Sequence, residues 1–557
     1  MLICENLDVH AGRDGPKLLQ SVSVCFPAQG MHAIVGPSGC GKTTLVRALL
    51  GLIPSSGHVR LGGQVIERPE QLVGRVGFAP QFSIAQPHLS VDESLRFSLR
   101  LTVASGSERK RRLASILETT GLEAHRHKRV SALSGGQLRR LGLGLEFANE
   151  PPVLICDEVT SGLDPNSEDQ ILDLLRSLVR TEHKTFVNII HNLGRLDRFD
   201  TVAVLYGGVL VFQGPPAQLL AYLRIENFTQ IYDRLEEEES GKWSARWAQA
   251  KAREETADTD PDDPPSALPA PARLPLPTTQ MGVLLWRRLL LFLRDRGYLF
   301  LTAAITFGFP CIVVIFALGG LGQLERPPLE PEGNPLEQTL ERLEYRLSAA
   351  ETGQLATGII LFQVILLTLM GSNNGAREIA GERQLYEKER LNGLNPLAFA
   401  GSKIAFVTGI ALFQGFWMTL FVKKLCYFPG SWPAQLAILG LCCLAMTLLS
   451  LGLSALFRSP DKASLLSIYF VGFQLPLSGI VLALPEMLIW VFRPFINAYW
   501  SWAGYVSGFR EERLFDAMNV YRDDVIPELP VALAVLAIHC VVGIGLVVQG
   551  CYRRQSV

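Results

Sequence analysis

The chain has 557 residues, and its 52 Lys and Arg against 53 Asp and Glu give a formal net charge of −1. This balance argues against nucleic acid as a partner, because nucleic-acid-binding proteins carry a basic surface. Hydrophobic residues make up 48% of the chain, charged residues 19%, and the mean hydropathy is +0.22. Such values are unusual for a soluble protein of this length and indicate membrane-embedded segments.

The average conceals two different halves. Up to about Leu223 the pattern is typical of a soluble α/β domain, and from about Tyr298 it is typical of a membrane domain. The first nine residues include Glu5 and Asp8 and do not resemble a signal peptide, so we expect the first half to stay in the cytosol. The ten cysteines lack zinc-ligand spacing and predict reduced, buried thiols without a disulfide framework.

A phosphate-binding loop is predicted after the apolar segment Met31–Val35. The loop is formed by Gly36, Pro37, Ser38, Gly39, Cys40, Gly41, Lys42 and Thr43, and a predicted helix follows from Thr44 to Leu52. The glycines let successive backbone N–H groups point at a phosphate, and the helix adds its positive N-terminal end. Lys42 supplies a charge for the β- and γ-phosphates, and Thr43 supplies a hydroxyl for Mg²⁺.

A second apolar strand is predicted over Val153–Asp157 and is followed by Glu158. A strand of this kind places two acids at the carboxyl edge of the sheet, beside the phosphate loop. Asp157 is then suited to hold Mg²⁺, and Glu158 to orient and polarise an attacking water. The alternative is an acidic surface turn, which the presence of Lys42 disfavours.

The phosphate loop and the two acids together predict a nucleotide hydrolase. The sequence Leu-Ser-Gly-Gly-Gln at 133–137 indicates which kind of nucleotide hydrolase this is. With it, the first 225 residues or so resemble the nucleotide-binding domain of ABC transporters. The whole layout is similar to the G-subfamily (White-type) half transporters and their bacterial relatives. This resemblance implies an α/β P-loop ATPase domain of the ABC type followed by an all-α membrane domain with six spans.

The resemblance also implies roles for individual residues, with ATP and Mg²⁺ as cofactors. Catalytic roles fall to Glu158, to the switch histidine His191 and to Gln81, while the metal ligands are Thr43, Gln81 and Asp157. Nucleotide contacts come from 36–43 with Thr44, from the signature residues Ser134, Gly135, Gly136 and Gln137, and from Asp164 at the dimer interface. The chain departs from the family at Val159, where proline is usual, and at His10, where the adenine-stacking residue is usually aromatic.

One chain carries one phosphate loop and one signature loop. In the resembled family these loops face each other across two subunits, so we expect a second half transporter as partner. A homodimer with two composite ATP sites is favoured, and a heterodimer with a sister chain is the alternative.

Four regions are predicted along the chain. They are the nucleotide-binding domain 1–225, an acidic and Pro-rich linker 226–278, an amphipathic connecting helix 279–297 at the cytosolic interface, and the membrane domain 298–557. The acidic run Glu236–Glu239 within the linker is interpreted as a solvated segment.

Six spans of about 20 apolar residues are predicted in the membrane domain. They are Tyr298–Leu318, Leu355–Ser372, Ile404–Val422, Ala434–Phe457, Ser464–Leu484 and Leu529–Gln549. An even number returns the C-terminus to the cytosol, in accord with Arg553 and Arg554 and with the arginines before the first span. Met487–Tyr505 is interrupted by Arg493, Pro494 and Asn497 and predicts a re-entrant or interfacial segment on the outer side. We expect a multi-pass protein of a bacterial inner membrane, in contact with lipid.

The loop after the second span is charged and helix-prone, and the resemblance makes it a coupling helix that docks on the ATPase domain near Gln81. We expect charge reversal at Glu382 or Glu389 to lower substrate-stimulated more than basal ATPase. The polar span residues Gln363, Gln414, Gln474 and His539 are interpreted as interhelical contacts.

The favoured function is an ATP-driven exporter of a hydrophobic or amphipathic cargo. The alternative is a membrane ATPase that transmits force or signal to an outside partner without moving cargo. The leucines within 335–350 recur at helical spacing and are the feature that favours this alternative.

Overall fold

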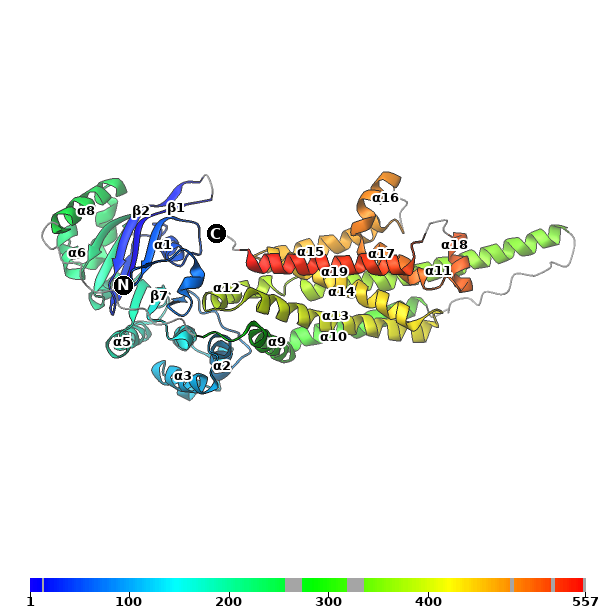
Figure 1. Cartoon of the computed structure of the whole chain (residues 1–557), viewed down its shortest axis with the longest axis horizontal. Helices are drawn as coiled ribbons and strands as arrows, with labels where there is room; N and C mark the ends of the chain where they lie inside the picture. The colour runs from blue at the N-terminus through cyan, green and yellow to red at the C-terminus, as the bar shows by residue number, and fades with distance from the viewer. Residues whose placement is uncertain (13–14, 256–272, 318–334, 481–484, 522–525, 554–557) are drawn as a thin grey trace. The chain divides into compact units, whose positions relative to one another are not determined.

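The computed structural model describes residues 1–12, 15–255, 273–317, 335–480, 485–521 and 526–553. These residues form two compact units, which are described separately (Figure 1). The first, here called the α/β unit, combines Met1–Val283 with the short segment Gln384–Asn395. The second, here called the helical unit, combines Leu284–Arg383 with Pro396–Arg553.

Two sheets make up the centre of the α/β unit. The smaller has the order β2-β1-β4-β5, and the larger has the order β10-β9-β3-β8-β7-β6. The strands are β1 (Leu2–His10), β2 (Lys17–Phe26), β3 (Met31–Val35), β4 (Ser56–Leu61), β5 (Gln64–Val65), β6 (Val76–Ala79), β7 (Val153–Asp157), β8 (Thr185–Ile189), β9 (Thr201–Tyr206) and β10 (Val209–Gly214).

The larger sheet is parallel over β6, β7, β8, β3 and β9, and β10 pairs antiparallel to β9. Every residue of β3, β7 and β8 is buried, as expected for strands covered on both faces. Parallel strands end at one common edge, so the residues that follow β3, β6, β7 and β8 are brought together there.

The helices of this unit start at residues that suit helix N-termini. Ser90 and Ser134 form capping boxes with Glu93 and Gln137, and Asp164 caps a helix whose first residue is proline. The helices are α1 (Lys42–Leu49), α2 (Val91–Thr102), α3 (Gly106–Thr119), α4 (Gly135–Glu146), α5 (Pro165–Glu182), α6 (Pro216–Leu223), α7 (Ile231–Glu236), α8 (Ser240–Glu255), α12 (Arg383–Leu391) and the first turns of α9 (Pro277–Arg294).

The segment predicted as a linker differs from the expectation in its first part. Ile231 and Leu235 of α7 and Trp243 of α8 are fully buried in the core of the α/β unit. The apolar residues of the two helices are not recognisable as one buried face in the sequence, because the acidic run Glu236–Glu239 lies where α7 ends and α8 begins. Residues 256–272, the Pro-rich part of the predicted linker, lie outside the described residues.

The helical unit consists of one long antiparallel bundle and several shorter helices. They are α10 (Arg296–Phe316), α11 (Pro335–Gly375), α13 (Pro396–Cys426), α14 (Trp432–Leu456), α15 (Pro460–Gln474), α16 (Glu486–Phe492), α17 (Asn497–Ser507), α18 (Arg513–Tyr521) and α19 (Leu529–Tyr552). Among the described residues, five helices are long and apolar enough to cross a membrane, and α10, α11, α13, α14 and α19 account for them.

Five of the six predicted spans coincide with these helices, and the span predicted over Ser464–Leu484 differs. There α15 has only 15 residues and ends at Gln474, ahead of a 3₁₀ turn at Pro476–Ser478. Proline lacks an N–H group and disfavours helix at the residue before it, which explains the break. Met487–Tyr505, predicted as interrupted, is divided between α16, a 3₁₀ turn at Arg493–Phe495 and α17.

Small residues set the packing of the long helices. A Cβ atom on Gly375 of α11 would lie 2.5 Å from the backbone of α14, and one on Gly550 of α19 would lie 2.6 Å from Ala455. Such close backbone approach is how membrane helices gain contact without a hydrophobic driving force.

Buried polar residues tie the bundle together. Gln414 of α13 accepts a hydrogen bond from Asn374 at 2.7 Å and donates one to Thr306 at 3.1 Å. Gln474 accepts from the backbone N–H of Ala498, and a ring nitrogen of His539 lies 2.9 Å from the carbonyl oxygen of Pro494. Three of the four predicted interhelical residues therefore make such contacts.

A buried charge cluster joins α9 and α13 to the segment that follows α11. Glu378 accepts two hydrogen bonds from the Arg288 guanidinium, at 2.5 and 2.7 Å, and a third from Lys403 at 2.9 Å. Lys403 also lies 2.8 Å from Glu382. The side chains of Glu378 and Lys403 are 5% and 3% exposed, so each buried charge has an opposite charge in contact.

Candidate functional site

The predicted phosphate loop connects β3 to α1, as the sequence indicates. Gly36 and Gly41 have φ values of +156° and +104°, which side-chain-bearing residues rarely adopt. A Cβ atom on Gly36 would lie only 2.1 Å from the carbonyl oxygen of Leu205. Glycine is thus required for the loop to curl against the neighbouring strand.

Lys42 lies across the inside of this loop. Its ammonium group donates to the carbonyl oxygens of Gly36 and Pro37, at 2.7 and 3.0 Å, and the residue is 7% exposed. Among the described residues, no carboxylate forms an ion pair with this ammonium group. A buried ammonium held by neutral carbonyls is suited to exchange one of them for a phosphate oxygen.

Glu158 stands at the carboxyl edge of the sheet, directly after β7. Gln81, which follows β6, donates from Nε2 to Glu158 Oε2 at 2.6 Å. His191, which follows β8, places Nε2 2.7 Å from Glu158 Oε1. The three residues predicted to be catalytic are thereby brought together by three neighbouring parallel strands.

The backbone of Glu158 is strained. Its φ is +52°, in the left-handed region that costs a non-glycine residue of order 1 kcal/mol or more. The side chain is only 12% exposed and both of its oxygens have partners. The strand end therefore holds this carboxylate in one orientation.

Asp157 occupies the last position of β7 and is 7% exposed. Burial raises the pKa of its carboxyl, and the negative charge of Glu158 adds to the shift. The positive charges of Arg47 and Lys42 and the hydroxyl of Thr43 oppose it. A buried carboxylate beside a hydroxyl, with its charge incompletely balanced, suits a hard divalent cation that takes its remaining ligands from phosphates and water.

The signature residues lie at the start of α4. Ser134 accepts from the backbone N–H of Gln137, and Gln137 accepts in return from the N–H of Ser134. Gly135 and Gly136 form the first turn, which leaves their N–H groups pointing out of the helix end. Within the part of the chain that the structure describes, no hydrogen bond joins Ser134–Gln137 to the phosphate loop.

Asp164 and His10 occupy more peripheral positions. Asp164 caps α5 through the backbone N–H of Ser167 at 3.0 Å, and hydrogen bonds from Ser167 lower the pKa of its carboxyl. His10 ends β1, is exposed, and has a ring nitrogen 3.4 Å from the carbonyl oxygen of Gly15.

The helix α12 is part of the α/β unit and supplies contacts that the sequence did not reveal. Lys388 of α12 lies 2.7 Å from Glu146 at the end of α4, with side chains 7% and 1% exposed. Asn392 donates to the other oxygen of Glu146 at 3.2 Å, and Asn149 donates to the carbonyl of Asn392 at 3.1 Å. The only sequence signal for this site is a glutamate among the leucines of an apolar helix face.

A small cavity lies where α12 meets the site. It is lined by Ala79, Pro80 and Ser83 around Gln81, by Arg139, Gly142 and Leu143 of α4, by Val159, and by Lys388. Gly142 permits this close approach, because a Cβ atom there would lie 2.6 Å from the hydroxyl of Ser83. The loop of Gln81, the residue after Glu158 and α12 thus share one contact region.

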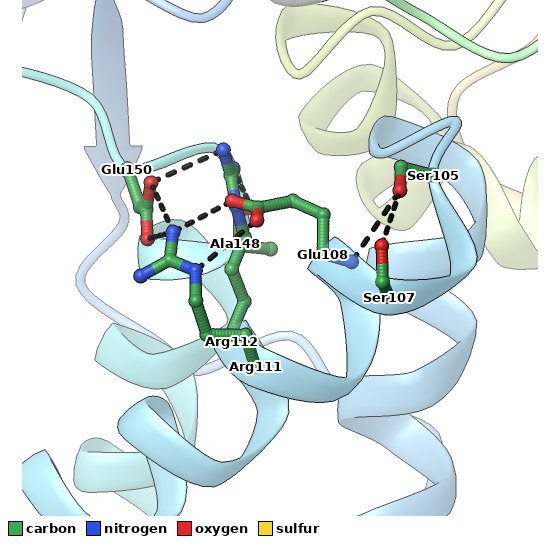
Figure 2. Close-up of polar contacts among 7 residues, drawn as sticks. All are labelled: Ser105, Ser107, Glu108, Arg111, Arg112, Ala148 and Glu150. Atoms are coloured by element: carbon green, nitrogen blue, oxygen red, sulfur yellow. Dashed lines mark hydrogen bonds and ion pairs between the residues drawn. The ribbon is translucent and has the colours of Figure 1, made fainter.

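An ion network braces the end of α4 (Figure 2). Glu108 of α3 pairs with Arg111 at 2.6 Å and with Arg112 at 2.7 Å, and both arginines also reach Glu150. Arg112 donates to the carbonyl of Ala148 at 2.9 Å. The network holds residues 148–150 in place and with them Asn149, which contacts Asn392.

Comparisons with known proteins match both halves of the chain. Residues 19–161 match the family described as ABC transporter, and residues 279–507 match the family described as ABC-2 type transporter. The methionine import ATP-binding protein MetN of Caulobacter vibrioides is 36% identical over 221 residues, which cover 38% of this chain and 67% of that protein.

Two further relatives match different shares of the chain. The ABC transporter ATP-binding/permease protein Rv1747 of Mycobacterium tuberculosis is 29% identical over 490 residues, covering 84% of this chain. The chain spans about half the length of that relative, with 53% covered. ABC transporter G family member 5 of Arabidopsis thaliana is 37% identical over 227 residues, which cover 39% of this chain and 35% of that protein.

Proposed function

We propose, from the premise that this chain belongs to the ABC transporter family and joins an ABC ATPase domain to an ABC-2 type membrane domain, that two copies form an ATP-driven exporter. The cargo is hydrophobic or amphipathic. The observation that carries this proposal is the pair of incomplete half-sites in one chain. Lys42, Asp157 and Glu158 converge on one edge, whereas among the described residues no hydrogen bond joins the signature helix end at Ser134 to that edge.

ATP binding follows from the geometry of the phosphate loop. The backbone N–H groups of 36–43 and the ammonium of Lys42 receive the phosphates. Thr43, Asp157 and Gln81 would hold Mg²⁺, which when bound neutralises charge on the phosphates. Glu158, held by Gln81 and His191, polarises the attacking water.

The second half of the site comes from the partner subunit. A phosphoryl-transfer transition state needs hydrogen-bond donors already aimed at its oxygens. The end of α4, with Ser134 and Gly136, offers such donors, and a second copy arranged head to tail would bring them to the phosphates. Closure of the two α/β units then moves α12 with them, since Lys388 and Asn392 bind α4 directly.

The membrane placement follows the charge pattern. We propose a multi-pass protein of a bacterial inner membrane with both termini in the cytosol. The bundle surface is rich in exposed apolar side chains such as Phe300, Ile315 and Val541, which suits contact with lipid.

A complementation experiment tests the composite site. One tagged chain carries Ser134→Glu and the other, with a second tag, carries Glu158→Gln; each alone is expected to be inactive. Mixed dimers isolated through both tags contain one intact site, because each site takes Glu158 from one chain and Ser134 from the other. We expect about half of the wild-type ATPase activity in the mixed dimer. Activity no higher than in either single variant would contradict a head-to-tail dimer.

A transport assay separates the exporter from the alternative. Inverted membrane vesicles with wild-type protein are expected to accumulate a labelled lipid or drug when ATP is added, and vesicles with Glu158→Gln are not. ATP turnover without accumulation of any member of a broad cargo panel would favour force or signal transmission instead.

A further inference from the structure

The first turns of α11 extend beyond the packed bundle of the helical unit. This helix has 41 residues and is therefore about 60 Å long, twice the thickness of the hydrocarbon core of a bilayer. Its apolar stretch begins near Leu355, so about five and a half turns precede the membrane-spanning part. Figure 1 shows this end of α11 continuing past α18.

The exposed part of α11 has two distinct sides. On one side Ala349, Thr352 and Ala356 are 2%, 8% and 0% exposed, and nearby Gly353 would bring a Cβ atom within 2.4 Å of the carbonyl of Ala517 in α18. This side packs on the rest of the chain.

The opposite side carries a stripe of leucines. Leu340, Leu343 and Leu347 are 52%, 53% and 57% exposed. At 100° per residue they point about 150–180° away from the packed side. Their spacing of three and then four residues is the a–d–a pattern of a coiled coil.

We propose that this leucine stripe, Leu340, Leu343 and Leu347, is the core of a parallel two-stranded coiled coil formed with α11 of a second copy of this chain. The inference rests on the proposed dimer and assigns one of its contacts. Both copies enter the same membrane at the same residue, so the two helices run in the same direction and in register. A parallel, in-register arrangement places each leucine opposite its own counterpart.

Charged residues beside the stripe fit this arrangement. With Leu340 and Leu347 at positions a, Arg346 occupies position g and Glu351 position e of the following turn, and both are exposed. A parallel pair sets Arg346 of one subunit against Glu351 of the partner subunit, and the reverse, which gives two interhelical ion pairs. The charges therefore select a second copy over an apolar partner or the lipid surface.

The leucine stripe is short, but each α11 helix is anchored by its own membrane-spanning part. Two heptads do not dimerise as a free peptide, but helices tethered by their own spans meet at a high effective concentration. The contact would hold the outer ends of the two α11 helices together while the rest of the bundle opens outward.

Site-specific crosslinking in native membranes tests the proposal. Leu343→Cys is introduced at position d of the full-length chain, and Ser348→Cys, also exposed but at outer position b, is the matched control. Mild oxidation is followed by non-reducing electrophoresis, with the wild-type chain as background for the native cysteines. We expect Leu343→Cys to form covalent dimers about tenfold faster or more than Ser348→Cys, since a disulfide needs Cα atoms within about 7 Å.

The charges provide a second readout in the Leu343→Cys chain. Arg346→Glu is expected to slow crosslinking by about two- to fivefold, and the swap Arg346→Glu with Glu351→Arg to restore it. Equal or absent crosslinking at positions 343 and 348 would overturn the proposal. Light scattering on the purified wild-type protein measures separately whether the chain is a dimer. A stable dimer that does not crosslink at position 343 would contradict the coiled coil but not the proposed dimer.

Discussion

The α/β unit and the helical unit both bury charged groups, but they balance these charges in opposite ways. In the α/β unit, the ammonium group of Lys42 donates to two carbonyl oxygens, and burial together with the charge of Glu158 raises the pKa of Asp157. In the helical unit, Glu378 accepts from both Arg288 and Lys403. Buried charges that lack an opposite charge in contact mark a place where a charged ligand binds. Buried charges that form ion pairs with one another have a structural role.

The contact between α12 and α4 shows that this distinction does not simply separate the two units. Lys388 and Glu146 lie in the α/β unit, yet they form a closed pair like that of Glu378. Removing a buried charge that lacks an opposite charge in contact is therefore expected to change ligand binding or catalysis. Removing one member of a buried ion pair is expected to lower the stability of the fold.

The largest effect is expected at Glu158. Replacement by Gln keeps the shape of the side chain but removes the charge that polarises water, so ATP turnover should fall by about 10²- to 10⁴-fold while ATP binding persists. Phosphate release and nucleotide binding are measured on the same purified protein. Turnover within a few-fold of wild type would remove Glu158 from the catalytic role.

Changes in the buried charge cluster around Glu378 are expected to lower the stability of the protein. Glu378→Gln leaves Arg288 and Lys403 buried with less compensating charge, which is expected to cost about 3–5 kcal/mol. Thermal inactivation in detergent, together with the yield of folded protein, measures the loss. Asp461→Asn is the control, because its pair with Arg377 is exposed, with side chains 87% and 68% accessible. Equal effects of the two variants would contradict the assignment.

The pair between α12 and α4 should give a smaller coupling. Lys388→Gln and Glu146→Gln are each expected to destabilise the protein, and the double variant to lose about 1–3 kcal/mol less than the sum, because it leaves no unpaired charge. Thermal unfolding of the four chains completes the cycle. The same cycle on the exposed pair Lys17–Asp8 should give less than about 1 kcal/mol, and additive losses at 388 and 146 would argue against a direct pair.

The smallest effect is expected at the surface network of Figure 2. Hydrogen bonds from Arg111 and Arg112 lower the pKa of Glu108 from its ordinary 4.5 to about 2. The contribution of this carboxylate to stability is therefore complete above about pH 4.5 and disappears as the pH falls toward 2. Glu108→Gln should cost no more than about 1 kcal/mol at neutral pH.

Unfolding curves at several pH values test this prediction. The difference between wild type and Glu108→Gln should vanish in acid, whereas Glu118→Gln, an exposed change on the same helix, should be neutral throughout. A difference that persists at pH 2 would mean that packing, not charge, is lost.

The positions of short segments with strict local requirements can be predicted from the sequence. The loop 36–43 needs glycines at particular positions, and Asp157 with Glu158 must follow a buried strand, so spacing predicts both. Gln81 and His191 were placed by resemblance, and the parallel order of β6, β7 and β8 explains why they meet at Glu158. Their chemical roles, and those of the signature residues, remain predictions.

The remaining features depend on contacts between residues far apart in the chain. Glu146 and Lys388 are separated by more than 240 positions, and neither is unusual in its local sequence. Glu378, just after α11, meets Arg288 of α9 and Lys403 of α13 only in the packed helical unit, and Trp243 is buried only because α8 folds back on the sheet. The conformation of a short loop is determined by neighbouring residues and can be predicted from them. The pairing of buried charges is decided only in the tertiary structure, where segments from distant parts of the chain exclude water from the same space.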